Sequence, residues 1–206
     1  MLLVFEMAWD LKKELARKVI HLMTVSFIII FLIISRTYGR ALALLALVFL
    51  LIVFLELEYV RVELRKKIPF IWRFFREKEK ERLGGQAFFL IGAIISLAVF
   101  DFDIAVTAIL MTTFGDMAAA LIGRRFGHIW ITKTRALEGI LAEFIVDLLI
   151  AYFILQNWPI VFVMAITATV VEAAIEKLDD NLIIPLFSGF NGQLIRVILA
   201  ALNLKI

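Results

Sequence analysis

Apolar stretches long enough to cross a lipid bilayer follow one another along almost the whole chain. A transmembrane helix needs about 20 mostly apolar residues, because a helix rises about 1.5 Å per residue and the hydrocarbon core is about 30 Å thick. Seven stretches approach this length: residues 19–35, 41–57, 84–100, 104–122, 138–156, 159–177 and 182–202. Hydrophobic residues make up 63% of the 206 residues, far more than a soluble domain of this size can bury. The sequence therefore predicts an all-α, polytopic integral membrane protein with about seven transmembrane helices.

The last of these stretches is the weakest, because polar and helix-breaking residues interrupt it. These residues are Pro185, Gly189, Asn191, Gly192 and Arg196. A kinked transmembrane helix and a re-entrant piece both fit this pattern, since irregular backbone at membrane depth is tolerated where protein surrounds it.

Two segments outside the apolar stretches are amphipathic. Residues 1–18 mix large apolar and charged side chains, which is typical of a helix lying in the membrane interface. Residues 58–82 carry nine of the 22 Lys and Arg residues, with four aromatic residues after Pro69. An anionic membrane surface explains such a basic segment, and no nucleic-acid-binding motif accompanies it, so we expect no nucleic-acid partner. We expect one transmembrane domain over residues 1–206 that includes both segments.

The distribution of basic residues predicts the orientation. With a cytoplasmic N-terminus, 18 of the 22 Lys and Arg residues lie on the cytoplasmic side, and only Arg36, Arg40 and Lys205 lie on the other. Cytoplasmic loops of membrane proteins carry such an excess. In this topology the intramembrane acids lie in the cytoplasmic half of the bilayer or near its middle. A cavity open to the cytoplasm would hydrate them there, so we expect the active site to face the cytoplasm.

Residues 114–138 contain the densest group of polar residues in the apolar part of the chain. Their pattern is D-x-x-A-x-x-x-G-R-x-x-G, from Asp116 through Ala119, Gly123 and Arg124 to Gly127. We expect the residues from Gly123 to Gly127 to form a compact turn whose N–H groups and guanidinium groups bind phosphate. An acid at helical spacing before that turn can hold Mg²⁺ that bridges phosphates. The alternative is a stripe of small residues that packs two helices together, followed by an ordinary basic loop.

Pairs of polar residues four apart share a helix face at several places. Glu143 and Asp147 form one such pair, and Glu172 and Glu176 form another. Two carboxylates on one face can share a metal ion, or one of them can accept the proton of an attacking hydroxyl. The alternatives to a functional role are structural: Glu176 pairs with a nearby cation, and Asp147 forms a hydrogen bond between helices.

The motifs of this chain resemble those of the CTP-dependent lipid-alcohol kinases, which include dolichol kinase, phytol kinase and CTP-dependent diacylglycerol kinase. The resemblance rests on the segments GDMAAALIGRRFG, RALEG and EAAIEKLDDNLIIPL, and extends to RKVIH and ERLGGQAFFLIG. The phosphatidate cytidylyltransferases share a similar but more distant pattern. The family usually has Lys followed by Ser or Thr before the Glu-Gly pair, and here these positions are Arg135 and Ala136. Either Arg135 or Lys133 must then supply the phosphate cation.

The resemblance implies the residues of a CTP and Mg²⁺ site. The expected catalytic residues are Asp116, Glu172 and Asp180, and the expected metal ligands are Asp116 and Glu172. The expected cofactor-binding residues are Gly115, Ala119, Gly123, Arg124, Arg125, Gly127, Lys133, Arg135, Glu138, Gly139, Asn181, Arg17 and His21.

The expected function is transfer of the γ-phosphoryl group of CTP to the hydroxyl of a lipid alcohol. The resemblance favours a polyprenol or dolichol-type alcohol, with geranylgeraniol, phytol and diacylglycerol in the same acceptor class, and an oligomer is compatible with the sequence. A CTP-dependent lipid cytidylyltransferase is the closest alternative. A secondary transporter that uses the intramembrane acids as an ion path is a further one, although no inverted repeat supports it.

Overall fold

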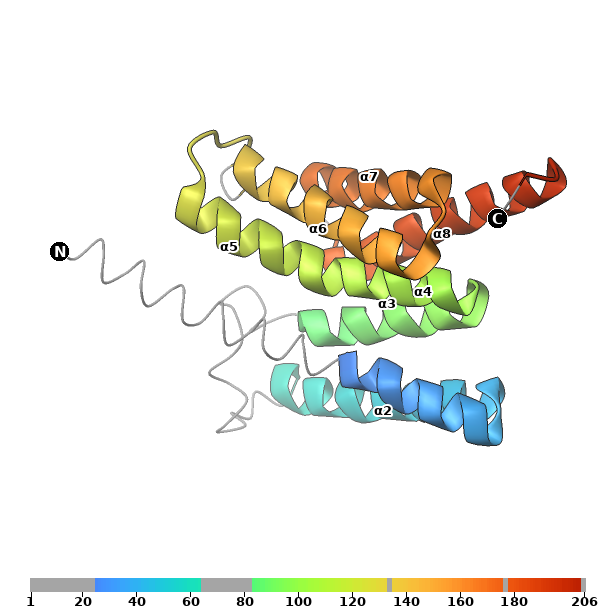
Figure 1. The fold of residues 1–206 in the computed structure, drawn as a ribbon. Coiled ribbons are helices and arrows are strands. Elements are labelled where there is room, and N and C mark those ends of the chain that lie inside the picture. Colours follow the sequence, from blue (N-terminus) through green and yellow to red (C-terminus); the bar gives the residue numbers. More distant parts are fainter. Residues whose placement is uncertain (1–24, 64–82, 133–134, 176–177, 205–206) are drawn as a thin grey trace. The chain divides into compact units, whose positions relative to one another are not determined.

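The computed structural model describes residues 25–63, 83–132, 135–175 and 178–204, and these residues are almost entirely helical (Figure 1). The only pairing of extended backbone among them is an isolated bridge between Trp130 and Ala136. The helices are Val25–Tyr38, α2 (Arg40–Val62), α3 (Gly85–Val99), α4 (Phe102–Leu110), the π-helix η3 (Met111–Gly115), α5 (Asp116–Phe126), α6 (Leu137–Leu155), α7 (Trp158–Ala174) and α8 (Asp180–Ala201). The prediction of an all-helical protein is confirmed.

Three of these helical stretches are long and apolar enough to cross a membrane. They are Arg40–Val62, Phe102–Phe126 and Asp180–Ala201. The helices Val25–Tyr38, Gly85–Val99 and Trp158–Ala174 are shorter and also apolar. The chain is therefore a helical membrane protein. The expected interfacial helix over residues 1–18 lies outside the described residues, as does most of the basic segment over residues 58–82.

The chain divides into two compact units, Met1–Leu90 and Ile91–Ile206. In the first unit, Gly39 links helix Val25–Tyr38 to α2 with φ of 92°, a backbone conformation that suits glycine. Near the end of α2, the buried side chains of Glu58 and Arg61 form an ion pair, and Glu58 also accepts a hydrogen bond from the Gly84 N–H at 2.9 Å. This last bond ties the end of α2 to the residues that precede α3.

In the second unit, α5 packs along α6, α6 along α7 and α7 along α8 (Figure 1). Small residues allow close contact at the core. A Cβ added to Gly192 would lie 2.7 Å from Cγ of Met164, and one added to Gly189 would lie 2.5 Å from Cε2 of the Phe100 ring. The two glycines therefore let α8 approach these large side chains on α7 and at the end of α3.

The weak last stretch of the sequence forms one continuous helix, α8, with Pro185 inside it. Proline lacks the N–H that would bond to the carbonyl four residues earlier, here that of Asn181. Gly92 of α3 lies against this site, because a Cβ added there would lie 2.8 Å from the Asn181 carbonyl oxygen. The hydroxyl of Ser96 donates to the Pro185 carbonyl at 3.4 Å.

Helices α4 and α5 form a single rod that is interrupted by the five-residue π-helix η3. Within η3, the hydroxyls of Thr112 and Thr113 donate to the carbonyls of Ala108 and Ile109 at 2.9 and 3.0 Å. Such π segments are rare and often lie at functional sites. Here the π-helix ends directly before Asp116.

The expectation of a compact turn from Gly123 to Gly127 is wrong for most of its residues. Gly123, Arg124 and Arg125 continue α5, which ends at Phe126, and only Gly127 lies beyond the helix. The apolar residues before Gly123 and the good helix propensity of arginine carry the helix through this region.

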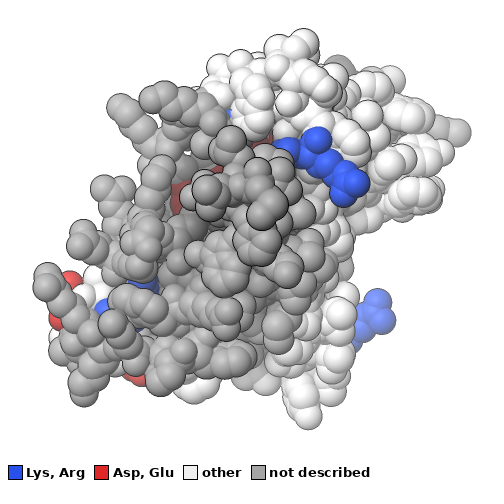
Figure 2. All heavy atoms as spheres, turned by 90° about the vertical axis from the view of Figure 1, so that its left-hand side faces the viewer, with Lys and Arg blue, Asp and Glu red and all other residues white. Residues whose placement is uncertain are grey.

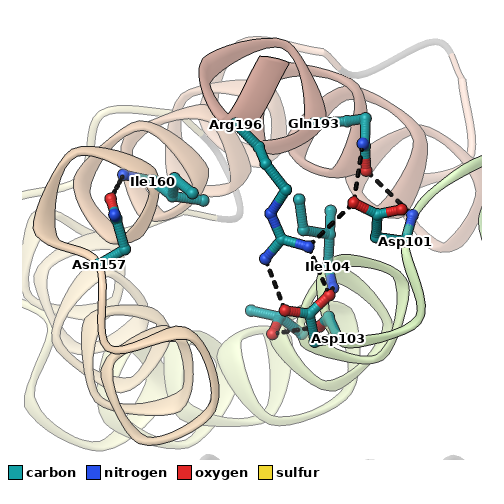
Figure 3. A network of polar contacts seen from close by, with 8 residues as sticks. Asp101, Asp103, Ile104, Asn157, Ile160, Gln193 and Arg196 are labelled. Carbon is teal, nitrogen blue, oxygen red and sulfur yellow. Dashed lines mark hydrogen bonds and ion pairs between the residues drawn. The ribbon is translucent and has the colours of Figure 1, made fainter. Parts of the chain in front are cut away.

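A polar network joins the start of α4 to the last part of α8 (Figure 3). The guanidinium of Arg196 donates to both carboxylate oxygens of Asp103, at 2.7 and 2.5 Å, and to Asp101 at 3.0 Å. Gln193 donates its side-chain amide to Asp101 at 3.0 Å and accepts from the Asp101 backbone N–H at 2.9 Å. The Gln193 amide and the Arg196 guanidinium hold the pKa of the Asp101 carboxyl below its ordinary value of 3.8. We call these four residues the polar clamp.

The polar clamp predicts that Arg196→Met destabilises the protein. The substitution leaves Asp103 and Asp101 without their cation and should lower the free energy of unfolding by about 1–2 kcal/mol, less than for a fully buried pair because both carboxylates are partly exposed. Thermal denaturation of the purified protein in detergent measures the loss, with Arg36→Met at an exposed position as the control.

The same variant has a pH signature. A carboxyl whose pKa is lowered by folding stabilises the folded state above its unfolded pKa and loses that contribution as the pH falls through its folded pKa. The stability difference between wild type and Arg196→Met should therefore shrink below about pH 3.8, the ordinary pKa of Asp101. A difference that stays constant down to pH 3 would contradict the ionic contribution of the clamp.

Candidate functional site

Five acidic side chains from four helices gather in the second unit. They are Asp116 at the start of α5, Glu143 and Asp147 on α6, Glu172 on α7 and Asp180 at the start of α8. We call them the acidic cluster. Glu143 interacts electrostatically with Asp147 and Asp116, and Glu172 with Asp116 and Asp180, so the five form one electrostatic group.

Three members of the acidic cluster are buried. Glu143 is 1% exposed, Asp147 is 0% exposed and Glu172 is 6% exposed. Asp116 and Asp180 are half-buried at the edge of the group. The carboxyl groups of Glu143 and Glu172 lie within hydrogen-bonding reach of each other, across the contact between α6 and α7. The sequence spacing pairs Glu143 with Asp147 on the same helix, and the structure adds Glu172 on the neighbouring helix as a further partner.

The buried carboxylates leave oxygens without hydrogen-bond partners among the described residues. These atoms are Oε2 of Glu143, Oε2 of Glu172 and both carboxylate oxygens of Asp147. Buried polar groups in proteins are normally paired, so unpaired oxygens at this depth require a proton, a cation or a ligand. Carboxylate oxygens are the ligands that Mg²⁺ prefers, and the donor set therefore fits the ion that the sequence resemblance implies.

Asp147 lies against the π-helix. A Cβ added to Gly115, the last residue of η3, would lie 2.5 Å from Oδ1 of Asp147. Glycine at this position thus leaves the space that the carboxylate occupies, directly beside the backbone that leads into Asp116. The cofactor-binding role of Gly115 stays a prediction, and what the structure shows is that this glycine makes room for a buried acid.

Arg135 is the described basic residue that faces the acidic cluster. It lies just before α6, is half-buried and interacts electrostatically with Glu143. Its Nη1 atom is buried and has no hydrogen-bond partner among the described residues. A guanidinium with an unused donor beside carboxylates is suited to bind an anionic group that shares the site.

The loop between α5 and α6 is held in a defined conformation. The Ile131 N–H donates to the Arg135 carbonyl at 2.9 Å, and the Leu137 N–H donates to the Ile129 carbonyl at 2.8 Å. Glu138, expected to bind the cofactor, accepts from the backbone N–H of His128 at 2.9 Å and so fastens this loop to the start of α6. The loop contacts place Arg135 beside the site.

The glycines of the central motif lie where α5 crosses α6. A Cβ added to Gly139 would lie 2.7 Å from the carbonyl oxygen of Ala119 and 3.0 Å from Cα of Gly123, while one added to Gly127 would lie 2.6 Å from Cβ of Ala136. The two backbones therefore approach more closely than side chains would permit. This is the helix-packing role that the sequence analysis gave as the alternative, and it brings Asp116 and Glu143 onto facing helices.

The remaining predicted site residues lie at helix ends or outside the described residues. Arg124 and Arg125 are exposed at the end of α5; Figure 2 views this end of the molecule, with Lys and Arg in blue. Asn181 is buried, and its amide donates to Asp179 at 2.9 Å where α8 begins. Arg17, His21 and Lys133 lie outside the described residues, as does Glu176.

The described residues contain no ready-made metal cage. Within residues 25–63, 83–132, 135–175 and 178–204, no group of three or more Asp, Glu, His or Cys side chains is arranged to hold a metal ion. The expected ligand pair of Asp116 and Glu172 remains a prediction. Mg²⁺ is commonly bound by one or two carboxylates together with phosphate oxygens, which needs no such cage.

The fold and the site together define a class of protein: a helical membrane protein with buried acids and an arginine near them. The chain is 27% identical over 152 residues to CTP-dependent diacylglycerol kinase 1 of Saccharomyces cerevisiae, which covers 67% of this chain and 49% of the yeast protein. It is 29% identical over 133 residues to the Schizosaccharomyces pombe protein of the same name, covering 55% of this chain and 61% of that one. It is also 29% identical over 192 residues to an uncharacterised Rickettsia prowazekii protein, covering 86% and 92%.

These similarities confirm the resemblance to the CTP-dependent lipid kinases that the sequence motifs indicate. The chain spans about half the length of the Saccharomyces cerevisiae relative. No family model and no solved structure matches this chain.

The crossing of α5 and α6 predicts the effect of a larger side chain at Gly139. In Gly139→Val the new Cβ would meet backbone atoms of α5, which cannot rotate away, so the helices must separate. We expect a loss of about 1–3 kcal/mol in unfolding free energy, typical of overpacking, seen as a lower thermal midpoint in detergent. Ala174→Val, which introduces the same residue at an exposed position of α7, is the control. Equal midpoints for both variants would rule out the close crossing.

Proposed function

We propose that this protein is a membrane lipid kinase that transfers the γ-phosphoryl group of CTP to the hydroxyl of a lipid alcohol. The observation that carries the proposal is the acidic cluster of a chain similar to CTP-dependent diacylglycerol kinases. Several of its buried oxygens have no hydrogen-bond partner among the described residues, and Arg135 interacts electrostatically with its member Glu143. A kinase site needs carboxylates for a metal ion and cations for phosphate, and both are present here.

The proposed acceptor is the hydroxyl of a polyprenol or dolichol-type alcohol. The names of the yeast relatives make diacylglycerol a second candidate acceptor. Diacylglycerol and the polyprenol-type alcohols are both lipids with a single reactive hydroxyl. Such an alcohol enters from the membrane, while the nucleotide enters from the cytoplasm. The proposal includes seven membrane spans in a single domain, a cytoplasmic N-terminus and a cytoplasmic site.

In this proposal the chain positions two substrates and neutralises charge. Asp116 and Glu172 bind Mg²⁺ and Arg135 binds phosphate oxygens, with Arg124, Arg125, Arg17 and Lys133 as further cations. Bound Mg²⁺ neutralises charge on the phosphates. The close crossing of α5 and α6 holds Asp116 near Glu143 and excludes water between the helices, which strengthens the electrostatic interactions of the site.

The test is transfer of label to lipid by the purified protein in detergent with Mg²⁺. CTP labelled at the α or the γ phosphate is offered with polyprenols, phytol, geranylgeraniol, diacylglycerol and phosphatidic acid. We expect γ label in a lipid alcohol, and a fall of at least about 100-fold in Asp116→Asn, because the variant loses a proposed carboxylate ligand of Mg²⁺. Glu63→Gln, at an exposed position after α2, is the control.

The position of the label separates the alternatives. Label from the α phosphate in phosphatidic acid would replace the kinase by a lipid cytidylyltransferase. Absence of lipid label from either position, with nucleotide binding intact, would refute the proposed reaction for these acceptors.

A further inference from the structure

Glu143 and Glu172 form a buried pair of carboxyl groups that contact across two helices. They lie within hydrogen-bonding reach, and each has an Oε2 atom without a hydrogen-bond partner among the described residues. Two ionised carboxylates this close repel each other strongly in an apolar interior, so a proton or a cation has to lie between them. The pair is therefore a candidate cation site.

The surroundings of the pair add negative charge. Asp116 faces the pair from α5, Asp147 from α6 and Asp180 from α8, and Arg135 is the described cation beside them. Asp147 is fully buried, its two carboxylate oxygens have no hydrogen-bond partner within the described part of the chain, and Gly115 leaves room for it. Among the described residues, the buried carboxylates of Glu143, Asp147 and Glu172 outnumber the one guanidinium beside them, and the negative potential that they create favours a divalent ion.

The described residues cannot complete the coordination of such an ion alone. No group of three acids or histidines among them is arranged as a metal site, whereas Mg²⁺ demands six ligands. Two carboxylates supply part of this shell. Phosphate oxygens of a nucleotide, held by Arg135, supply chemically suitable ligands for the rest.

We propose that Glu143, together with Glu172, binds the Mg²⁺ that accompanies the nucleotide, and that this ion binds only when nucleotide phosphates complete its shell. The proposal rests on the proposed function and adds Glu143 to its metal ligands. It also predicts an order: no divalent ion occupies the pair in the nucleotide-free protein, and the ion binds together with the nucleotide.

The test measures Mn²⁺, a spectroscopic substitute for Mg²⁺, with the full chain in detergent. The EPR signal of free Mn²⁺ reports binding with and without CDP, which has phosphates but cannot donate a γ-phosphoryl group. We expect wild type to bind Mn²⁺ only with CDP present. Glu143→Gln should weaken this binding by about 10-fold or more, because a carboxylate ligand becomes a neutral amide. Glu143→Asp, which keeps the charge on a shorter side chain, should bind with intermediate affinity.

Thermal denaturation of the same variants separates metal binding from a folding defect. In the metal-free protein, Glu143→Gln removes one of two repelling carboxylates and should leave the midpoint unchanged or raise it. The rise in midpoint that Mn²⁺ and CDP give to wild type should be lost in this variant. A lower metal-free midpoint in Glu143→Gln would overturn the proposal, because the pair would then be a structural hydrogen bond.

The other outcomes are equally distinct. Wild-type affinity for Mn²⁺ in Glu143→Gln, equal binding with and without CDP, or no binding by wild type would each overturn the proposal. Binding as expected without transfer of γ label to lipid would refute the kinase and leave the metal site standing. If wild type transfers γ label to lipid and Glu143→Gln still binds Mn²⁺ normally, the kinase stands and the proposed metal site is refuted.

Discussion

The burial of carboxylates among apolar helices is the constraint that the second unit has to satisfy. Removing an ion from water costs several kcal/mol even after relaxation, and Glu143, Asp147 and Glu172 are almost completely buried. Tight packing of the surrounding helices must offset this cost. The crossing at Gly123 and Gly139 provides such packing and at the same time sets which side chains face each other. Stability and the geometry of the acidic cluster thus depend on the same contact.

The two polar groups of the second unit differ in how completely they are satisfied. In the polar clamp, Arg196 donates hydrogen bonds to the carboxylates of both Asp101 and Asp103 and offsets one of their two negative charges. The acidic cluster begins at Asp180, which lies 16 residues before Arg196 and hence about 24 Å away along α8. Counted over the described residues, the buried part of this cluster has more carboxylates than cations, and four of its oxygens have no hydrogen-bond partner. Proteins retain such unsatisfied groups mainly where function requires them.

The helices were predictable from the sequence because the length of an apolar run reflects the thickness of a bilayer. Observed boundaries lie within a few residues of those predicted, as in α6, which was expected over residues 138–156 and covers Leu137–Leu155. Contacts between helices were not predictable in the same way. The spacing of Glu143 and Asp147 shows that they share a face, but it does not show that Glu172 meets that face. Arg196 was seen as an interruption of an apolar run, and its partners at Asp101 and Asp103 lie more than 90 positions away.

The π-helix η3 changes how the sequence of the fourth apolar stretch maps onto space. An α-helix turns about 100° per residue. A π turn contains one extra residue, so the residues after it are out of register with the α-helix before it. Residues of α5 are therefore rotated by about 100° relative to where a continuous α-helix from α4 would place them. A helical wheel drawn through the whole of Phe102–Phe126 assigns Asp116 to the wrong side of the rod. Removal of one residue from η3 would rotate Asp116 away from Glu143 while leaving every amino acid of α5 unchanged.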